Sequence, residues 1–332
     1  MFYYFTKEKF IFIYFYLSLS VFYCVANSAE SVSLSSEFIL PEKGKLTILF
    51  EGKDLRLEAA LFGSENLWIT FTAQSSKAGL GLNGKIDREM ERFGHDSFIH
   101  REIDALYVVS YQNDWGYTEE MKTVLTIAQS IIKQSRYKNI ITYGLSMGGY
   151  KALLFSERLG ATMAFVFCPQ TALEEVIKEH KANITDIVKG IMKGEQAHFL
   201  SEASKKYIKR LNLEDLSSME ISLPQVMKAI GLEEIFFRRK QLGSCKFLIC
   251  YSEKNDFDKG QVDKLQGVYS QESDNLTLWP LPAGLHDSAS VLSKVNFFPK
   301  IVELVNQGKI DEITKALERD GELWKAIEAL GV

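Results

Sequence analysis

From residue 105 onward, short apolar runs alternate with segments whose apolar residues recur at helical spacing. The runs are ALYVVSY at 105–111, NIITY at 139–143, MAFVFC at 163–168, KFLICY at 246–251 and LTLWPL at 276–281. The segment at 119–134, between the first two runs, carries its apolar residues on one helical face. Apolar runs flanked by helices are typical of a parallel sheet that is covered on both faces. The alternation therefore predicts an α/β fold.

The chain before residue 105 adds three more strand-like runs. Residues 45–51 and 55–62 are separated by a Gly-Lys-Asp turn that is typical of a hairpin, and LWITFTA follows at 67–73. Together with the five later runs, they predict an eight-stranded, mostly parallel sheet with helices on both faces.

One long segment interrupts this alternation. Between Pro169 and Ser244 the chain shows helical periodicity without a strong strand. The segment is too long for a simple connection between two sheet elements. We therefore expect a helical cap at 171–244 within a domain at 38–306, followed by a C-terminal helical extension at 307–332.

The first 29 residues differ in composition from the rest of the chain. Lys7 and Lys9 precede an apolar stretch at 10–26, and small residues follow it. This order is typical of an export signal, and the stretch is also at the short limit for spanning a membrane. We therefore expect residues 1–29 to be a signal peptide or membrane anchor, and the chain to be exported or membrane-anchored. The alternative is a cytoplasmic chain with a misassigned start.

The cysteines favour the cytoplasmic alternative to a small degree. Cys24 lies inside the leader, which leaves three cysteines: Cys168, Cys245 and Cys250. An odd number of this kind is not a disulfide framework, and thiols within apolar runs are commonly buried.

The charge pattern limits the expected partners. The formal net charge is −4, and no long basic or acidic block occurs. A nucleic-acid-binding surface requires clustered positive charge, so nucleic acid is not an expected partner.

The run at 139–143 leads into Gly144-Leu145-Ser146-Met147-Gly148, which fits the pattern G-x-S-x-G. Because it follows a strand-like run and opens a helical segment at 147–158, it has the setting of a nucleophile elbow. In such a turn the serine backbone is strained, and the glycines let strand and helix approach closely. The pattern predicts a nucleophilic Ser146, with the Met147 N–H placed to stabilise negative charge. A phosphate-binding turn is the alternative.

A serine nucleophile needs a base to accept its proton. Four of the five histidines lie upstream or within the expected cap: His95, His100, His180 and His198. His286 lies in a loop just after the run at 276–281 and before a helical segment. Chain order therefore makes His286 the expected base. A surface or helix-capping histidine is the alternative.

The third residue of such a site is a carboxylate after the preceding strand. The run at 246–251 is followed by SEKNDFD, which supplies Glu253, Asp256 and Asp258. Asp256 lies closer to the strand end, whereas Asp258 also fits the N-cap of a helical segment near 261–269. The spacing leaves Asp256 and Asp258 open, with Glu253 as the third choice.

A second oxyanion donor is expected after the run at 67–73, where Ala73 or Gln74 would supply a backbone N–H. Trp115 follows the run at 105–111 on the same predicted edge of the sheet, where open α/β folds bind ligands. We therefore expect Trp115 to contribute to substrate binding. An ordinary loop and an ordinary turn are the alternatives.

With Ser146, an aspartate and His286 in this order, the chain resembles the α/β-hydrolase superfamily over residues 45–306. Three segments are further similar to a bacterial group associated with surface polysaccharide loci: Asn113-Asp114-Trp115, Tyr143 to Tyr150, and Phe167-Cys168-Pro169-Gln170. The resemblance implies a tyrosine at the end of the seventh strand and an aspartate seven residues later. Tyr251 and Asp258 match this spacing, which favours Asp258 over Asp256.

Two positions depart from the pattern that the resemblance implies. Thr72-Ala73 replaces the His-Gly pair that is usual after the third strand, which leaves the second oxyanion donor open. Cys168 stands where the bacterial group is expected to have a serine.

The resemblance implies an α/β-hydrolase fold with a helical cap, and a serine esterase that needs no cofactor and no metal. The expected substrate is a small-molecule or saccharide ester, with an O-acyl group on a carbohydrate or glycoconjugate as the favoured form. Two other interpretations remain open besides the serine esterase, since one fold can serve many functions. One is an acyltransferase with the same triad, and the other is a catalytically silent binding module.

Overall fold

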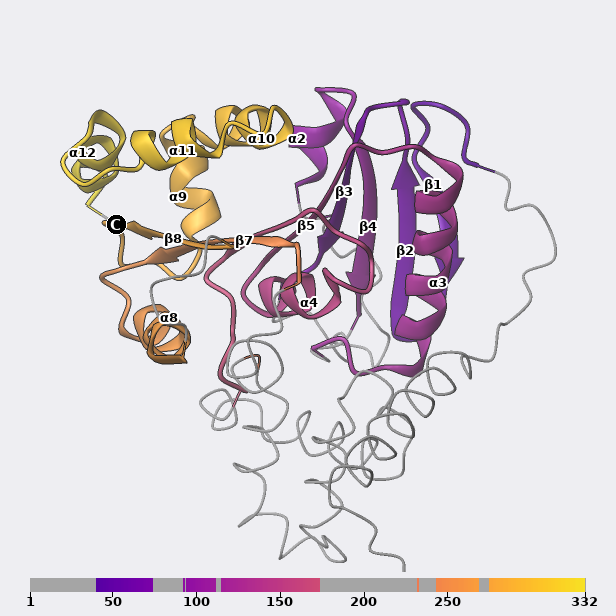
Figure 1. Ribbon diagram of the computed structural model, residues 1–332, viewed down its shortest axis with the longest axis horizontal. Helices are drawn as coiled ribbons and strands as arrows, with labels where there is room; N and C mark the ends of the chain where they lie inside the picture. The colour runs from indigo at the N-terminus through magenta and orange to yellow at the C-terminus, as the bar shows by residue number, and fades with distance from the viewer. Residues whose placement is uncertain are drawn as a thin grey trace, which may run out of the picture. The chain divides into compact units, whose positions relative to one another are not determined.

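The computed structural model describes residues 40–73, 92, 94–111, 115–173, 232, 243–268 and 275–331. Eight strands in these residues form one sheet (Figure 1). They are β1 (Thr47–Glu51), β2 (Leu55–Ala60), β3 (Asn66–Phe71), β4 (Asp104–Ser110), β5 (Asn139–Leu145), β6 (Met163–Phe167), β7 (Lys246–Ser252) and β8 (Leu276–Leu281).

The strands lie in the order β1-β2-β4-β3-β5-β6-β7-β8. Strand β2 is antiparallel to β1 and to β4, and every other neighbouring pair is parallel. The carboxyl ends of β3 to β8 therefore meet at one edge of the sheet, which is where open α/β sheets bind ligands. The predicted eight-stranded, mostly parallel sheet is confirmed.

The described residues also contain eight helices. They are α2 (His95–Ile99), α3 (Glu119–Gln134), α4 (Met147–Phe155), α8 (Asp256–Val268), α9 (Ser288–Lys294), α10 (Phe298–Asn306), α11 (Ile310–Ala316) and α12 (Glu322–Ala329). Helix α8 lies on the opposite side of β7 and β8 from helices α9 to α12 (Figure 1).

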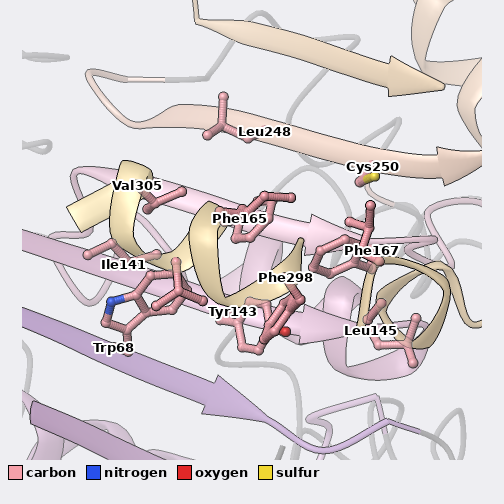
Figure 2. Close-up of a cluster of buried hydrophobic side chains, with 14 of the residues drawn as sticks. Trp68, Ile141, Tyr143, Leu145, Phe165, Phe167, Leu248, Cys250, Phe298 and Val305 are labelled. Carbon is pink, nitrogen blue, oxygen red and sulfur yellow. The ribbon is translucent and has the colours of Figure 1, made fainter. Parts of the chain in front are cut away.

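Aromatic side chains fill both faces of the sheet. Tyr143 of β5 lies 5.8 Å from Phe165 of β6 and 5.9 Å from Phe298 of α10, measured between ring centroids. Figure 2 shows Phe298 and Val305 of α10 beside these rings. On the other face, the Phe71 ring of β3 lies 5.9 Å from the Phe155 ring of α4. Helices thus cover both faces, as the apolar runs predict.

Helix α8 begins at Asp256, earlier than the predicted start near Gln261. The side chain of Asn255 explains the difference, because its Oδ1 accepts a hydrogen bond from the backbone N–H of Asp258 at 3.1 Å. This is the contact of a helix N-cap. The polar residues after β7 therefore form a cap and a first helical turn that contains both Asp256 and Asp258.

The C-terminal helices pack into the same core as the sheet. Ile313 of α11 and Ile327 of α12 are buried in the cluster that contains Trp68 and Phe165. The predicted boundaries of the domain at 38–306 and the extension at 307–332 remain predictions. Residues 174–231 and 233–242, most of the predicted cap at 171–244, lie outside the described residues.

The expectation that the chain is exported or membrane-anchored is corrected. A bilayer-spanning helix needs a long and predominantly apolar sequence. In the part of the chain that the structure describes, no helix combines the length and the apolar character that crossing a membrane requires. Residues 1–29, on which the expectation was based, lie outside that part.

Candidate active site

Ser146 lies at the turn between β5 and α4, with φ of 57° and ψ of −122°. A positive φ is rare and strained for a residue with a side chain, and such strain is concentrated at functional sites. A hydrogen bond anchors the turn to the neighbouring strand β6, because the Ser146 N–H donates to the carbonyl of Phe167 at 2.9 Å. The strained serine therefore lies at the carboxyl edge of the sheet, between the ends of β5 and β6.

The two glycines that flank Ser146 allow this turn to form. A Cβ atom on Gly144 would lie 2.3 Å from the backbone of Gly148, and a Cβ atom on Gly148 would lie 2.3 Å from the carbonyl oxygen of Phe71. Both distances are far below van der Waals contact, and the clashing atoms belong to backbone that cannot swing aside. Helix α4 can approach strand β5 and the end of strand β3 this closely only when Gly144 and Gly148 are both glycine.

His286 and Asp258 are in direct contact. His286 Nδ1 lies 2.5 Å from Asp258 Oδ1, and the Asp258 side chain is fully buried while the His286 side chain is 36% exposed. A buried carboxylate on Nδ1 fixes the ring orientation and the tautomer, with the other ring nitrogen, Nε2, free to exchange protons. Asp256 is exposed at the start of α8, so the structure brings Asp258 to His286 and not Asp256.

The loop that carries His286 is tied to the end of β7 by three hydrogen bonds. Ser252 Oγ donates to the carbonyl of Leu285 at 2.5 Å, Asn255 Nδ2 donates to the carbonyl of Gly284 at 3.0 Å, and the Lys254 N–H donates to the carbonyl of Ala283 at 3.1 Å. These contacts join the loop after β8 to the end of β7 and to Asn255, the residue that caps α8. They therefore fix the separation of His286 from Asp258.

Three loops converge at the edge where β5, β6, β7 and β8 end. Ser146 follows β5, Asp258 follows β7 and His286 follows β8, and the strands β5, β6, β7 and β8 are consecutive and parallel in the sheet. No hydrogen bond joins the side chains of Ser146 and His286 within the described residues. Hydrogen bonds between catalytic residues are often long without substrate and shorten in the complex, so this geometry is compatible with a nucleophile and a base.

The expected oxyanion donors lie at two places. Met147 is the first residue of α4, where backbone N–H groups lack partners within the helix. Thr72 already donates its N–H to the carbonyl of Val108 at 3.2 Å, which leaves the next residue, Ala73, as the candidate donor after β3. Gln74 lies outside the described residues.

Trp115 is fully buried and also has a positive φ, 49°. Its Nε1 donates to Gln170 Oε1 at 2.9 Å, and the Gln170 N–H donates to the carbonyl of Ser146 at 3.3 Å. The ring therefore supports the elbow through Gln170 and does not present an aromatic face to solvent. No role was expected for Gln170, although it lies within the similar segment at 167–170.

Two further polar residues near the site were not expected. Lys151 of α4 is completely buried, and its Nζ donates to Ser110 Oγ at 2.8 Å. Cys168, directly after β6, has a φ of 41°, and its Sγ lies 3.0 Å from Ser288 Oγ. A lysine in a helical segment is usually solvated, and a cysteine after a strand usually packs in the core, so the local sequence did not predict a role for either residue.

One group of side chains in the described residues has the composition of a metal site. The ligand atoms of Cys168, Asp258 and His286 lie within 4.8 Å of one another. Donors on one tetrahedral zinc ion are about 3.3 Å apart, since each bond is about 2.0–2.3 Å long. The 2.5 Å between His286 Nδ1 and Asp258 Oδ1 is shorter than this and is a hydrogen-bond distance. The arrangement fits a histidine oriented by a carboxylate and not a metal centre.

Comparison with known proteins finds similar folds. No family model and no curated protein matches the chain. Among solved structures, the capsule O-acetyltransferase of Neisseria meningitidis serogroup A is similar, with a TM-score of 0.47, 14% identity, and coverage of 78% of this chain and 93% of that chain. The Glycosylation Associate Protein (Gap123) complex of Streptococcus agalactiae has a TM-score of 0.49 and 15% identity, covering 78% of this chain and 46% of that chain.

The third structure is XC6422 from Xanthomonas campestris, described as an α/β serine hydrolase without a lid. It has a TM-score of 0.39 and 10% identity, and covers 85% of this chain and 98% of that chain. Likenesses at this level concern the fold alone. The strand order, the antiparallel second strand and the strained turn after the fifth strand identify the chain as having the predicted α/β-hydrolase fold.

Proposed function

We propose that the protein is a serine hydrolase that cleaves a carboxylic ester, with Ser146 as the nucleophile, His286 as the base and Asp258 as the residue that orients His286. The observation that carries the proposal is the 2.5 Å contact between His286 Nδ1 and Asp258 Oδ1 at the edge of the sheet where the strained Ser146 lies. A carboxylate on one ring nitrogen raises the affinity of the other for a proton.

In the first half of the reaction, Ser146 Oγ attacks the ester carbonyl carbon while His286 Nε2 takes the hydroxyl proton. The carbonyl electrons move onto oxygen, where the backbone N–H groups of Met147 and Ala73 stabilise the negative charge. When the carbonyl re-forms, the bond to the alcohol breaks and His286 gives its proton to the leaving oxygen. The acyl group is then held on Ser146.

In the second half, water enters beside His286, whose side chain is 36% exposed. His286 takes a proton from the water as its oxygen attacks the acyl carbon, and returns this proton to Ser146 Oγ when the acid leaves. Asp258 contacts His286 Nδ1, and its burial in the first turn of α8 keeps the ring in one orientation.

For the alcohol part of the ester we propose a carbohydrate or glycoconjugate that carries an O-acyl group. The support is the sequence similarity of the segments at 113–115, 143–150 and 167–170 to the bacterial group associated with surface polysaccharide loci. Acyl transfer to a sugar is the second candidate, because the same covalent acyl-serine intermediate reacts with whichever hydroxyl reaches it.

The test is labelling of the purified protein with a fluorophosphonate probe, followed by a panel of acetyl, butyryl and longer nitrophenyl esters. The wild type is expected to be labelled and to release nitrophenol, and Ser146→Ala to lose labelling and at least about three orders of magnitude in kcat. An unlabelled wild type would support the binding module instead. Acetate release that falls when a sugar acceptor is added, with acetylated sugar as the product, would identify a transferase.

A further inference from the structure

Asp258 has one carboxylate oxygen that lacks a conventional hydrogen-bond donor. Oδ1 contacts His286 Nδ1, whereas Oδ2 is buried and has no hydrogen-bond partner within the described residues. A buried charged oxygen without a donor is unfavourable, so a neighbouring group that points a proton at it has a large effect on how the carboxylate is held.

The thiol of Cys168 is placed next to this carboxylate. Its Sγ, a carboxylate oxygen of Asp258 and a ring nitrogen of His286 all lie within 4.8 Å of one another. Cys168 follows β6, and its N–H donates to the carbonyl of Cys250 on the adjacent strand β7 at 2.7 Å. The side chain is therefore anchored between the element that carries Ser146 and the element that carries Asp258.

The backbone of Cys168 is strained to make this placement. Its φ of 41° is in a region that residues with a side chain rarely occupy. Strain of this kind persists where the surrounding structure requires it, and strained residues cluster at functional sites. Two other non-glycine residues at this edge of the described sheet also have a positive φ: Ser146 in the nucleophile elbow, and Trp115, whose ring contacts Gln170.

The thiol keeps its proton. Burial raises the pKa of Cys168 to about 12, and the charge of Asp258 acts in the same direction. Ser288 Oγ lies 3.0 Å from Cys168 Sγ. Ser252 Oγ lies 4.0 Å from the sulfur and donates its own proton to the Leu285 carbonyl. If the Ser288 hydroxyl donates to the sulfur, the S–H proton can point at the Asp258 carboxylate, which is a stronger acceptor than the Ser252 hydroxyl.

We propose that Cys168 is a positioning residue, whose thiol donates a hydrogen bond to Asp258 Oδ2 and so holds the carboxylate in the orientation that contacts His286. This inference rests on the proposed function. It also explains why a cysteine is compatible with the position where the similar bacterial group is expected to have a serine. Both side chains carry a hydrogen-bond donor on the γ atom, an S–H in cysteine and an O–H in serine.

Other titratable groups lie on the elements around this carboxylate. Burial raises the pKa of Cys250 on β7 and of Tyr143 on β5 well above their usual values, so both remain neutral while esters are hydrolysed. Asp256 lies on the same helix as Asp258, and Asp287 follows His286 and caps α9. Cys168 is therefore a neutral donor among these groups, and its removal changes hydrogen bonding without changing the net charge.

The experiment compares Cys168→Ser and Cys168→Ala with the wild type by steady-state hydrolysis of nitrophenyl acetate from pH 5 to 9. Cys168→Ser keeps a donor and is expected to retain kcat within about twofold, whereas Cys168→Ala is expected to lose about five- to tenfold in kcat with little change in KM. Without the donor, more negative charge faces His286 and favours its protonated form. The acid limb of the kcat/KM profile should therefore move to higher pH in Cys168→Ala only.

Cys250→Ala is the matched control, because it also removes a buried thiol from this region but not one placed beside Asp258. It should lower the free energy of unfolding without moving the pH profile.

A second readout, the NMR titration midpoint of the His286 ring protons, does not depend on activity and should rise in Cys168→Ala. Equal profiles for Cys168→Ala and the wild type, or equal losses in the Ser and Ala variants, would overturn the inference. A wild type without fluorophosphonate labelling would instead count against the proposed function.

Discussion

Lys151 Nζ donates a hydrogen bond to Ser110 Oγ at 2.8 Å in a site that is closed to solvent. The Ser110 N–H donates in turn to Thr72 Oγ1 at 3.0 Å. This chain of contacts joins helix α4, which begins at the nucleophile elbow, to the ends of β4 and β3. It therefore connects the elbow with Ala73, the candidate oxyanion donor that follows Thr72.

Lys151→Met should destabilise the protein, because the methionine keeps the length of the side chain but leaves the buried Ser110 hydroxyl without its Lys151 donor. We expect the free energy of unfolding to fall by about 2 kcal/mol. Urea denaturation measures this change. The matched control is Lys122→Met on the exposed face of α3, which should change the free energy by less than about 0.5 kcal/mol. Similar losses in both variants would show that the Lys151 contacts do not contribute to stability.

Asp258→Asn should remove most activity, because an amide in place of the carboxylate favours the wrong tautomer of His286. The expected loss in kcat is about 10⁴-fold. Asp256→Asn, which changes an exposed carboxylate in the same helical turn, should retain the rate of the wild type. Nitrophenyl acetate hydrolysis at pH 8 measures both. A larger loss in Asp256→Asn than in Asp258→Asn would assign the orienting carboxylate to Asp256.

Gly148→Ala should disrupt the elbow, because its Cβ would lie 2.3 Å from the Phe71 carbonyl oxygen. Gly149→Ala is the graded control, since its Cβ would lie 3.0 Å from a side-chain carbon of Pro169 and needs only a small shift. We expect the first variant to lose several kcal/mol or fail to fold, and the second to lose about 1 kcal/mol. Urea midpoints and the rate of fluorophosphonate labelling measure both effects. If Gly148→Ala were labelled at the rate of the wild type, the close approach would not be needed for the nucleophile.

The features that could be predicted from the sequence are those that consecutive residues specify. The glycines around Ser146 and the apolar runs at 139–143 and 163–168 specify strand, turn and helix locally, so the succession of strands and helices along the chain could be predicted from pattern alone. The earlier start of α8 also has a local cause, the N-cap at Asn255, which was not recognised because the polar residues were interpreted as a loop.

The supporting contacts of the site could not be predicted in the same way, because their partners are distant in the sequence. Lys151 contacts Ser110, Trp115 contacts Gln170 and Cys168 contacts Ser288 only once the sheet has formed. A lysine in a helical segment is solvated in most proteins. Lys151 is buried here because other elements of the fold pack over it, and this packing is a property of the tertiary structure.

The thiol of Cys245 predicts how stability depends on pH. Burial raises its pKa from 9.0 to about 12 in the folded chain. In the unfolded chain the thiol loses its proton near the ordinary value, so between these two values the unfolded state binds fewer protons than the folded state. The free energy of unfolding therefore falls as pH rises through this window, by up to about 1.4 kcal/mol per pH unit for this thiol. Below the ordinary value both states keep the proton, and the contribution does not depend on pH.

Cys245→Ala removes this contribution and leaves the other buried thiols, Cys168 and Cys250, in place. Between pH 8 and pH 10.5 the wild type should therefore lose about 2 kcal/mol more than the variant, since only the upper part of this interval lies above the ordinary thiol pKa. Urea denaturation of both proteins under reducing conditions at several pH values measures the difference. Because tyrosines and lysines that titrate in this range are common to both proteins, their effects cancel in the comparison. Parallel curves for the two proteins would mean that the Cys245 thiol ionises as readily in the folded chain as in the unfolded one.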